Sequence, residues 1–338
     1  MSQKQGTLEN VFEETAADKN DIRWYRAPID RQVLVQLSER RDLAGLMQVA
    51  RHLGLLGITG AAFTWCCLSG SAVLACVTLV AHGTIYSFLG WAGAGHELAH
   101  RTVFRSRPLN VFFLRLFSFL TWNNYVYFVA SHTKHHKFTL HPELDGEVQV
   151  PQIVRYREWL WALTCDIPAL YRAIKITVEN SCGVIKGSWG ATLFPKSDPA
   201  ERERVFVCAR VILLGHATIV VASLASGLWP LVFATTLAPF FGTWLSKVLA
   251  LAQHIGMEPA ASDFRRNSRT VLPGRFIAFL YWQMNYHLEH HMYPGVPFFN
   301  LPKLRAQIEA DLPLAPTGML AIIVEMVSEK PQPAVSAA

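Results

Sequence analysis

The chain has 338 residues, of which 51% are hydrophobic and 17% charged, and its formal net charge is +6. An apolar content this high is unusual for a soluble domain and indicates membrane-spanning segments. The six cysteines include no C-x-x-C pair, so neither zinc-ribbon nor disulfide-framework spacing is present. The positive charge would suit nucleic acid or an anionic membrane surface, and its arrangement along the chain decides between them.

Two long apolar blocks predict four membrane-spanning helices, arranged as two hairpins. The first block holds no Asp, Glu, Lys or Arg, and a Ser-Gly-Ser break divides it into spans at 52–69 and 72–95. The second block, 205–252, is divided by a Gly-Leu-Trp-Pro break. Its only basic residues are Arg210 and Lys247, each near an end, where a long side chain can reach the membrane interface.

Further apolar and aromatic runs lie outside these blocks. The run 111–129 is interrupted by an arginine and two asparagines, so we expect a helix in or near the membrane interface rather than a fifth span. The Trp- and Tyr-rich segment 156–171 and the segment 276–286 are expected to be further interfacial helices.

The positive charges predict the topology. Lys and Arg number 8 in residues 1–52, 14 in 101–204 and 7 in 253–338, which together hold 29 of the 31. The positive-inside rule then places all three segments, and both termini, in the cytoplasm, and the charge pattern gives no nucleic-acid surface. We therefore predict an all-α membrane protein with four transmembrane helices, interfacial helices and a cytoplasmic helical cap. The predicted parts are an N-terminal cytoplasmic segment 1–51, membrane helices within 52–252 around a central cytoplasmic segment 96–204, a C-terminal cytoplasmic segment 253–338, and one integrated catalytic domain 52–310.

Histidines gather in three clusters. Eight of the 13 fall in one H-x-x-x-H pair or in one of two H-x-x-H-H boxes. These residues are His96 and His100 in the pair, His132, His135 and His136 in the first box, and His287, His290 and His291 in the second. Residues three and four apart share one face of a helix, so each cluster can present its imidazoles together. Because imidazole is a common ligand of transition metals, the clusters predict a metal site.

The predicted topology brings these clusters to one level beside the membrane. His254 follows the fourth span at the depth of His96, which makes nine imidazole donors, too many for one metal but suitable for two. Iron, zinc, copper and nickel all accept imidazole, whereas the absence of thiolate donors argues against an iron–sulfur or structural zinc site. Nearby acids are expected to accept hydrogen bonds from the outward-facing imidazole N–H groups: Glu97, Asp145, Glu147 and Glu289. Four other histidines are expected to be hydrogen-bonded residues at the membrane interface: His52, His82, His141 and His216.

Two other classes fit parts of this pattern. Residues 96–100 are a literal H-E-x-x-H, which offers two zinc ligands and a general base, and Asp145 resembles the distal aspartate of an intramembrane zinc protease. That interpretation leaves six clustered histidines without a role. A metal transporter would need ionisable groups along a path through the spans, and the predicted spans carry essentially none beyond His82 and His216.

The order and spacing of the three clusters resemble those of the membrane fatty acid desaturase and hydroxylase superfamily. Residues 285–294 (NYHLEHHMYP) are similar to the third box of bacterial members, and residues 267–270 (NSRT) fit the same comparison. The resemblance implies two irons held by the nine histidines, O₂ as co-substrate, a lipid or acyl substrate and a location in a bacterial inner membrane. It implies fatty acyl desaturation, with a hydroxylase or a hydrocarbon or carotenoid-type oxygenase as the alternative.

Three departures from the family pattern bear on the electron donor and on the position of attack. The chain lacks the His-Pro-Gly-Gly motif of a fused haem domain, so the resemblance implies a separate ferredoxin, rubredoxin or cytochrome. The third box begins with His287 where some members have Gln, and Ala250 stands where some animal enzymes have Asn.

Overall fold

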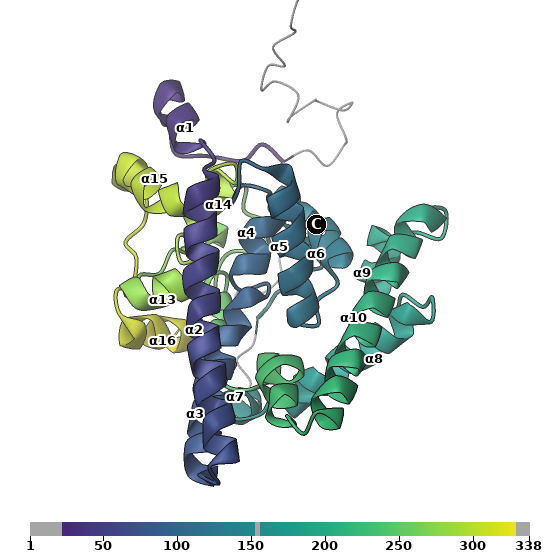
Figure 1. Ribbon diagram of the computed structural model, residues 1–338. Helices are drawn as coiled ribbons and strands as arrows, with labels where there is room; N and C mark the ends of the chain where they lie inside the picture. Colours follow the sequence, from purple (N-terminus) through teal and green to yellow (C-terminus); the bar gives the residue numbers. More distant parts are fainter. Residues whose placement is uncertain (1–21, 153–155, 329–338) are drawn as a thin grey trace, which may run out of the picture.

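The computed structural model describes residues 22–152 and 156–328, and every regular element within these ranges is a helix (Figure 1). The β pairing in the described residues consists of isolated bridges, such as the one between Tyr25 and Asp263. The all-α prediction is therefore confirmed for this part of the chain. Residues 1–21 of the predicted N-terminal segment 1–51 lie outside the described residues.

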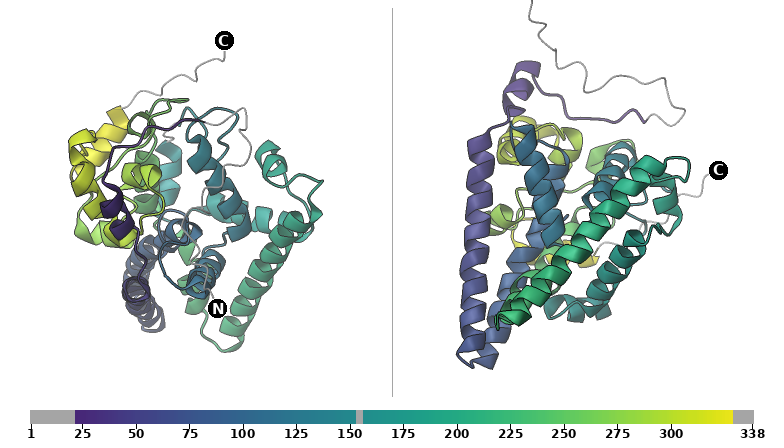
Figure 2. Two further views of the ribbon diagram at one scale, coloured as in Figure 1. Left: turned by 90° about the horizontal axis from the view of Figure 1, so that it is seen from above. Right: turned by 45° about the vertical axis from the view of Figure 1, so that its right-hand side comes forward.

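A long helical hairpin forms one edge of the molecule. Helix α2 (Asp42–Leu68) runs its full height, and α3 (Ala72–Tyr86) returns alongside it (Figures 1 and 2). The turn between them uses Gly70 at φ 75°, a backbone conformation that glycine adopts without steric cost. The helical stretch Ala72–Ala99 and helix α10 (Pro199–Ala225) are long and apolar enough to cross a membrane, judged by length and composition.

The fourth predicted span is not one continuous helix, which corrects the sequence-based expectation. Its residues form a short π-helix (η3, Val232–Thr236), a 3₁₀ turn (η4, Ala238–Phe240) and then α11 (Trp244–Ala252). Pro239 cannot donate a backbone hydrogen bond, and Gly242 has φ 57°, so regular α-helix is interrupted here.

Close packing against this interruption depends on a small residue in α3. A Cβ added at Gly83 would lie 2.2 Å from the carbonyl oxygen of Phe241 and 2.8 Å from that of Ala238. Gly83→Ala is therefore expected to destabilise the protein by roughly 1–3 kcal/mol, measured by thermal or denaturant unfolding of the purified protein. Gly57→Ala in α2, where nothing lies within 4 Å, is the control and should leave stability unchanged or slightly higher. Equal effects of the two changes would contradict this account.

The predicted interfacial runs are also broken into shorter helices. Residues 111–129 divide between α5 (Arg107–Leu120) and α6 (Tyr125–Phe138), so no single helix runs through them. The segment 156–171 contains α7 (Tyr156–Leu163) and the start of α8 (Ile167–Ser181), and α8 packs along α10. The helix expected at 276–286 is α13 (Arg275–Leu280), which ends before two residues of positive φ, Trp282 and Gln283.

Short helices complete the fold around the histidines. They are α1 (Arg31–Leu37), α4 (Ala94–Ala99), α9 (Ser188–Leu193), α12 (Phe264–Asn267), α14 (His287–Met292), α15 (Leu301–Ile308) and α16 (Met319–Ser328), with 3₁₀ turns η2 (Ser87–Leu89), η5 (Phe298–Asn300) and η6 (Glu309–Asp311). The fully buried Trp282 donates from its indole nitrogen to His52 Nδ1 at 3.0 Å, which ties the segment before α14 to α2. Figure 1 shows α4, α6 and α14 together, away from the α2–α3 turn.

Candidate metal centre

Four separate segments supply the nine histidines. In the pair, His96 lies in α4 and His100 directly follows it at the C-cap, while the first box lies in α6 and the second in α14. His254 lies in the turn that follows α11. The structure thus brings together residues that are up to 195 positions apart in the sequence, and all nine histidines predicted as metal ligands meet in one buried region.

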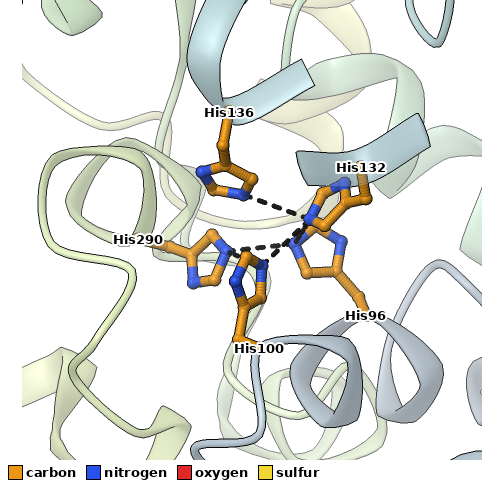
Figure 3. A group of neighbouring side chains, drawn as sticks. All are labelled: His96, His100, His132, His136 and His290. Atoms are coloured by element: carbon orange, nitrogen blue, oxygen red, sulfur yellow. Dashed lines mark hydrogen bonds between the residues drawn. The ribbon is translucent and has the colours of Figure 1, made fainter. Parts of the chain in front are cut away.

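The first group contains five imidazoles whose ligand atoms all lie within 4.8 Å of one another (Figure 3). Its members are His96, His100, His132, His136 and His290. His132 Nε2 is central, since it lies 3.0 Å from Nε2 of His96 and of His100 and 3.1 Å from that of His136. His290 Nε2 completes the group, 3.1 Å from His96 Nε2 and 3.0 Å from His100 Nε2.

The second group contains the other four imidazoles, which are all buried: His135, His254, His287 and His291. His287 Nε2 lies 2.9 Å from Nε2 of both His254 and His291. The two groups are adjacent, because the His136 and His291 rings stack with centroids 4.3 Å apart. Each H-x-x-H-H box therefore contributes to both groups, with His135 and His136 directed to different ones.

Hydrogen bonding alone cannot satisfy this convergence of ring nitrogens. The Asn267 carbonyl lies 2.7 Å from His254 Nδ1 and can only accept, so the proton is on Nδ1 and Nε2 carries a lone pair. Three Nε2 atoms around His132 Nε2 exceed the single bond that one neutral ring nitrogen can make. Ligands about 2.1 Å from one ion and at right angles to each other are about 3 Å apart, which is the spacing observed here. The residues present therefore fit two metal ions.

Burial keeps most of these imidazoles in the neutral form that binds metal. Desolvation, reinforced by the neighbouring rings, lowers the pKa of His132, His136 and His290 well below its ordinary value. Desolvation also lowers the pKa of His254 to about 3. His135 is different, because the Asp145 carboxylate outweighs burial and raises its pKa. Neutral imidazole is the ligating form, so the site favours metal over protons at most positions.

Three of the four predicted acids lie beside the imidazoles. Asp145 accepts from His135 Nδ1 at 2.8 Å, and Glu147 Oε1 lies 2.8 Å from His132 Nδ1. The buried Glu97 is more loosely placed, with Oε1 3.5 Å from His290 Nδ1. These contacts fix ring orientation and leave Nε2 pointing inward.

The prediction that Glu289 accepts a hydrogen bond from an imidazole N–H group is wrong. Its carboxylate accepts from the Thr270 hydroxyl and, at 2.5 Å, from Arg305 Nη1, and it contacts no imidazole nitrogen among the described residues. The reason is the helix itself, because Glu289 lies on the opposite face of α14 from the three histidines. Two further groups that contact the imidazoles could not be predicted from residue type. They are the Asn267 backbone carbonyl, beside His254 Nδ1, and the Thr139 hydroxyl, which lies 3.2 Å from His291 Nδ1.

Asp145→Asn is expected to lower metal affinity about 10–100-fold. The native carboxylate accepts from four donors, namely His135 Nδ1 and the backbone N–H groups of residues 140, 147 and 148, and an amide NH₂ would oppose two of them. Metal retained after dialysis against graded chelator measures the effect. Asp198→Asn, at the N-cap of α10, is the control and should retain metal like the native protein. Equal retention by both variants would contradict the role given to Asp145.

The histidines outside the clusters are hydrogen-bonded, as predicted. His82 Nδ1 lies 2.8 Å from the Thr59 hydroxyl and its Nε2 2.9 Å from the Ala234 carbonyl, and His216 Nε2 lies 2.9 Å from the Phe119 carbonyl. His52 and His141 likewise contact backbone carbonyls. The H-E-x-x-H pair of the protease interpretation lies in a group of five imidazoles, which exceeds the three protein ligands of a catalytic zinc site.

Comparison with known families agrees with this geometry. The sequence matches the Fatty acid desaturase family over residues 69–321, about three quarters of the chain, and this range includes all nine histidines. A search of curated proteins gives no match. Since the match covers most of the chain and both imidazole groups, the chain belongs to the fatty acid desaturase family.

Proposed function

We propose that this chain is a membrane enzyme that uses two irons and O₂ to oxidise an unactivated C–H bond of a lipid-like substrate, with fatty acyl desaturation as its reaction. The observation that carries the proposal is the division of nine imidazoles, seven of them buried, into adjacent groups of five and four. When bound, the iron pair would supply the O₂-dependent oxidation that amino-acid side chains cannot perform. Hydroxylation, including hydrocarbon or carotenoid-type oxygenation, is the alternative outcome of the same site.

The nine histidines would hold the irons. His96, His100, His132, His136 and His290 would bind one, and His135, His254, His287 and His291 the other. Iron accepts all-imidazole sets, and no cysteine among the described residues belongs to either group. Asp145, Glu147 and the Asn267 carbonyl would hold the rings in position, and the burial of the site would exclude water.

The same proposal includes four membrane crossings with the metal centre on the cytoplasmic side. Helices α2, α3 and α10 and the interrupted segment 231–252 would cross, and both termini would be cytoplasmic. The apolar composition of these segments supports this arrangement, as does the clustering of 29 of the 31 basic residues in 1–52, 101–204 and 253–338. The catalytic domain would be residues 52–310, in a bacterial inner membrane, and electrons would come from a separate ferredoxin, rubredoxin or cytochrome.

Metal content and product mass test the proposal together. The purified protein should contain about two irons per chain, and His135→Ala and His290→Ala, one from each group, should each lose iron. Retention of both irons by both variants would overturn the assignment. One zinc per chain, with activity lost only in Glu97→Gln and Asp145→Asn, would instead indicate a protease.

The reaction type is read from lipids of cells grown under ¹⁸O₂ with and without the gene expressed. Loss of two hydrogens from a lipid would establish desaturation. Gain of labelled oxygen would establish hydroxylation. Unchanged lipids in cells that also supply a ferredoxin, a rubredoxin and a cytochrome would contradict both.

A further inference from the structure

A groove of about 470 Å³ lies between α5, the first residue of α6 and the first half of α10, and we call it the α5–α10 groove. Arg115 of α5 and Arg204 of α10 line one end of it. Phe119 of α5 lines the other end, together with Val211 and Ile212 of α10. The groove is therefore charged at one end and apolar at the other, which is the polarity that an amphipathic ligand requires.

Contacts between helices fix the level of the groove. The Asn124 side chain at the start of α6 donates to the Val205 carbonyl of α10 at 2.8 Å. Val205 opens the apolar block of α10, and charged residues directly precede it. From there α10 runs along one side of the molecule toward the end that holds the α2–α3 turn (Figures 1 and 2). In the proposed membrane arrangement, the charged end of the groove is thus at the cytoplasmic interface and the apolar end lies deeper.

One positive charge at the interfacial end of the groove is not cancelled. Glu201 pairs with Arg204 at 2.6 Å, and Glu203 pairs with Arg210 at 2.7 Å. Arg115, in contrast, forms neither an ion pair nor a hydrogen bond among the described residues. The groove therefore has a net positive charge that an anion would neutralise.

The Arg115 guanidinium is placed to bind a phosphate group. The side chain is exposed, and its central carbon lies 5.6 Å from the centre of the Tyr125 ring, which limits its position without using its N–H groups. All five N–H donors of the guanidinium are left for a ligand. Arginine binds phosphate through two parallel hydrogen bonds, which gives both strength and orientation.

The apolar part of the groove is continuous with the outer face of α10. Val207, Val211 and Leu214 are exposed and lie three or four residues apart, so they share one face of the helix. Val207 and Val211 also line the groove. An acyl chain can therefore leave the groove along α10 and enter the surrounding lipid without crossing a polar surface.

The groove is separate from the metal centre. None of its lining residues is one of the nine clustered histidines. Phe119 at its apolar end stacks on His216, a histidine outside both imidazole groups, with ring centroids 4.7 Å apart. A molecule held in this groove is therefore a bound lipid and not the molecule that is oxidised.

We propose that the α5–α10 groove is a binding site for an anionic phospholipid of the cytoplasmic leaflet. The lipid phosphate binds Arg115, and an acyl chain follows Val207 and Val211. Basic pockets between membrane helices on the cytoplasmic side hold such headgroups in other proteins. The inference rests on the membrane arrangement in the function proposal, because that arrangement places Arg115 at the level of the headgroups.

Equilibrium binding to the full chain in detergent micelles tests the site. Native mass spectrometry compares three probes with the same acyl chain: dioleoylphosphatidylglycerol, dioleoylglycerol and oleate. The phospholipid should bind at least about tenfold more tightly than dioleoylglycerol, as expected for hydrogen bonds to a charged group. Equal affinity for these two lipids would overturn the proposal. Tighter binding of oleate than of the phospholipid would also overturn it, because the ligand would then be a free fatty acid.

Replacing the arginine locates the phosphate. Arg115→Gln should lower the affinity for dioleoylphosphatidylglycerol about tenfold and leave that for dioleoylglycerol unchanged. Arg107→Gln is the matched control, because Arg107 is an exposed residue of the same helix outside the groove. It should keep the native preference for the phospholipid. An unchanged preference in Arg115→Gln, or an equal loss in both variants, would refute the assignment of the phosphate to Arg115.

Filling the groove locates the acyl chain. Val207→Trp should weaken binding of both dioleoylphosphatidylglycerol and dioleoylglycerol, because the larger side chain occupies space in the groove. Val221→Trp introduces the same side chain at an exposed position of α10 outside the groove and should bind both lipids like the native protein. Native binding by Val207→Trp would show that the acyl chain lies elsewhere and would overturn the site.

Iron content measured in the same samples separates this proposal from the function proposal. Arg115→Gln should retain the native amount of iron, because it lies outside both imidazole groups. Loss of the phospholipid preference with iron retained supports the groove assignment. Retention of iron by His135→Ala and His290→Ala refutes the metal centre and leaves the lipid result intact, because lipid binding in micelles does not require iron.

Discussion

Replacing His132 with alanine is expected to abolish oxidation and to lower bound iron from about two per chain to about one or fewer. Its Nε2 lies within 3.1 Å of three other imidazole nitrogens, so its removal opens the centre of the five-imidazole group. Metal affinity depends on the full ligand set, and the loss of one ligand is a larger change than the loss of a supporting acid. Metal analysis and lipid mass spectrometry of the same preparation measure both effects.

His141→Ala is the matched control for this change. His141 lies just after α6, the helix that carries His132. Its ring centroid is 5.5 Å from that of Trp24, and it belongs to neither imidazole group. It should retain native iron and activity. Full activity in His132→Ala, or equal iron loss in both variants, would show that the five-imidazole group is not a metal site.

Replacing Arg305 with methionine is expected to destabilise the protein by about 3–5 kcal/mol, because it leaves the Glu289 carboxylate buried without its cation. The Arg305 side chain is 11% exposed and that of Glu289 is 0% exposed, with Nη1 2.5 Å from Oε1. Glu289 lies within the second histidine box on α14, so partial unfolding there should also release iron. Denaturant unfolding with iron content recorded at each step measures both consequences.

Two comparisons make this result specific. Arg204→Met disrupts an exposed pair with Glu201, whose side chains are 59% and 43% exposed, and should cost less than about 1 kcal/mol. The double variant Glu289→Gln/Arg305→Met removes both charges and should be more stable than Arg305→Met alone. If Arg305→Met costs no more than Arg204→Met, the buried pair does not support α14.

The composition and spacing of the histidines were enough to predict which nine imidazoles the structure brings together. The spacing in each cluster predicts a shared helical face. The positive-charge pattern predicts that the clusters lie at one level beside the membrane, and His254 was added to the predicted ligands because it follows a span at that level. The division into groups could not be predicted, because it depends on how α4, α6 and α14 approach one another. Neighbouring residues on a helix point about 100° apart, so His135 and His136 reach different groups only when each has partners from other helices.

Hydrophobicity predicted apolar blocks but not their regularity. The segment 231–252 has the composition of a span, yet Pro239 and Gly242 interrupt it where the α7–α8 turn packs against it. The pairing of Lys247 with Asp166 is likewise a product of this long-range contact. Sequence by itself determined the helical class, the family and the nine imidazoles, because these follow from residue type and local spacing. Only the tertiary structure decided how the nine imidazoles divide into two groups and which acids lie beside them, because these depend on contacts between segments far apart in the chain.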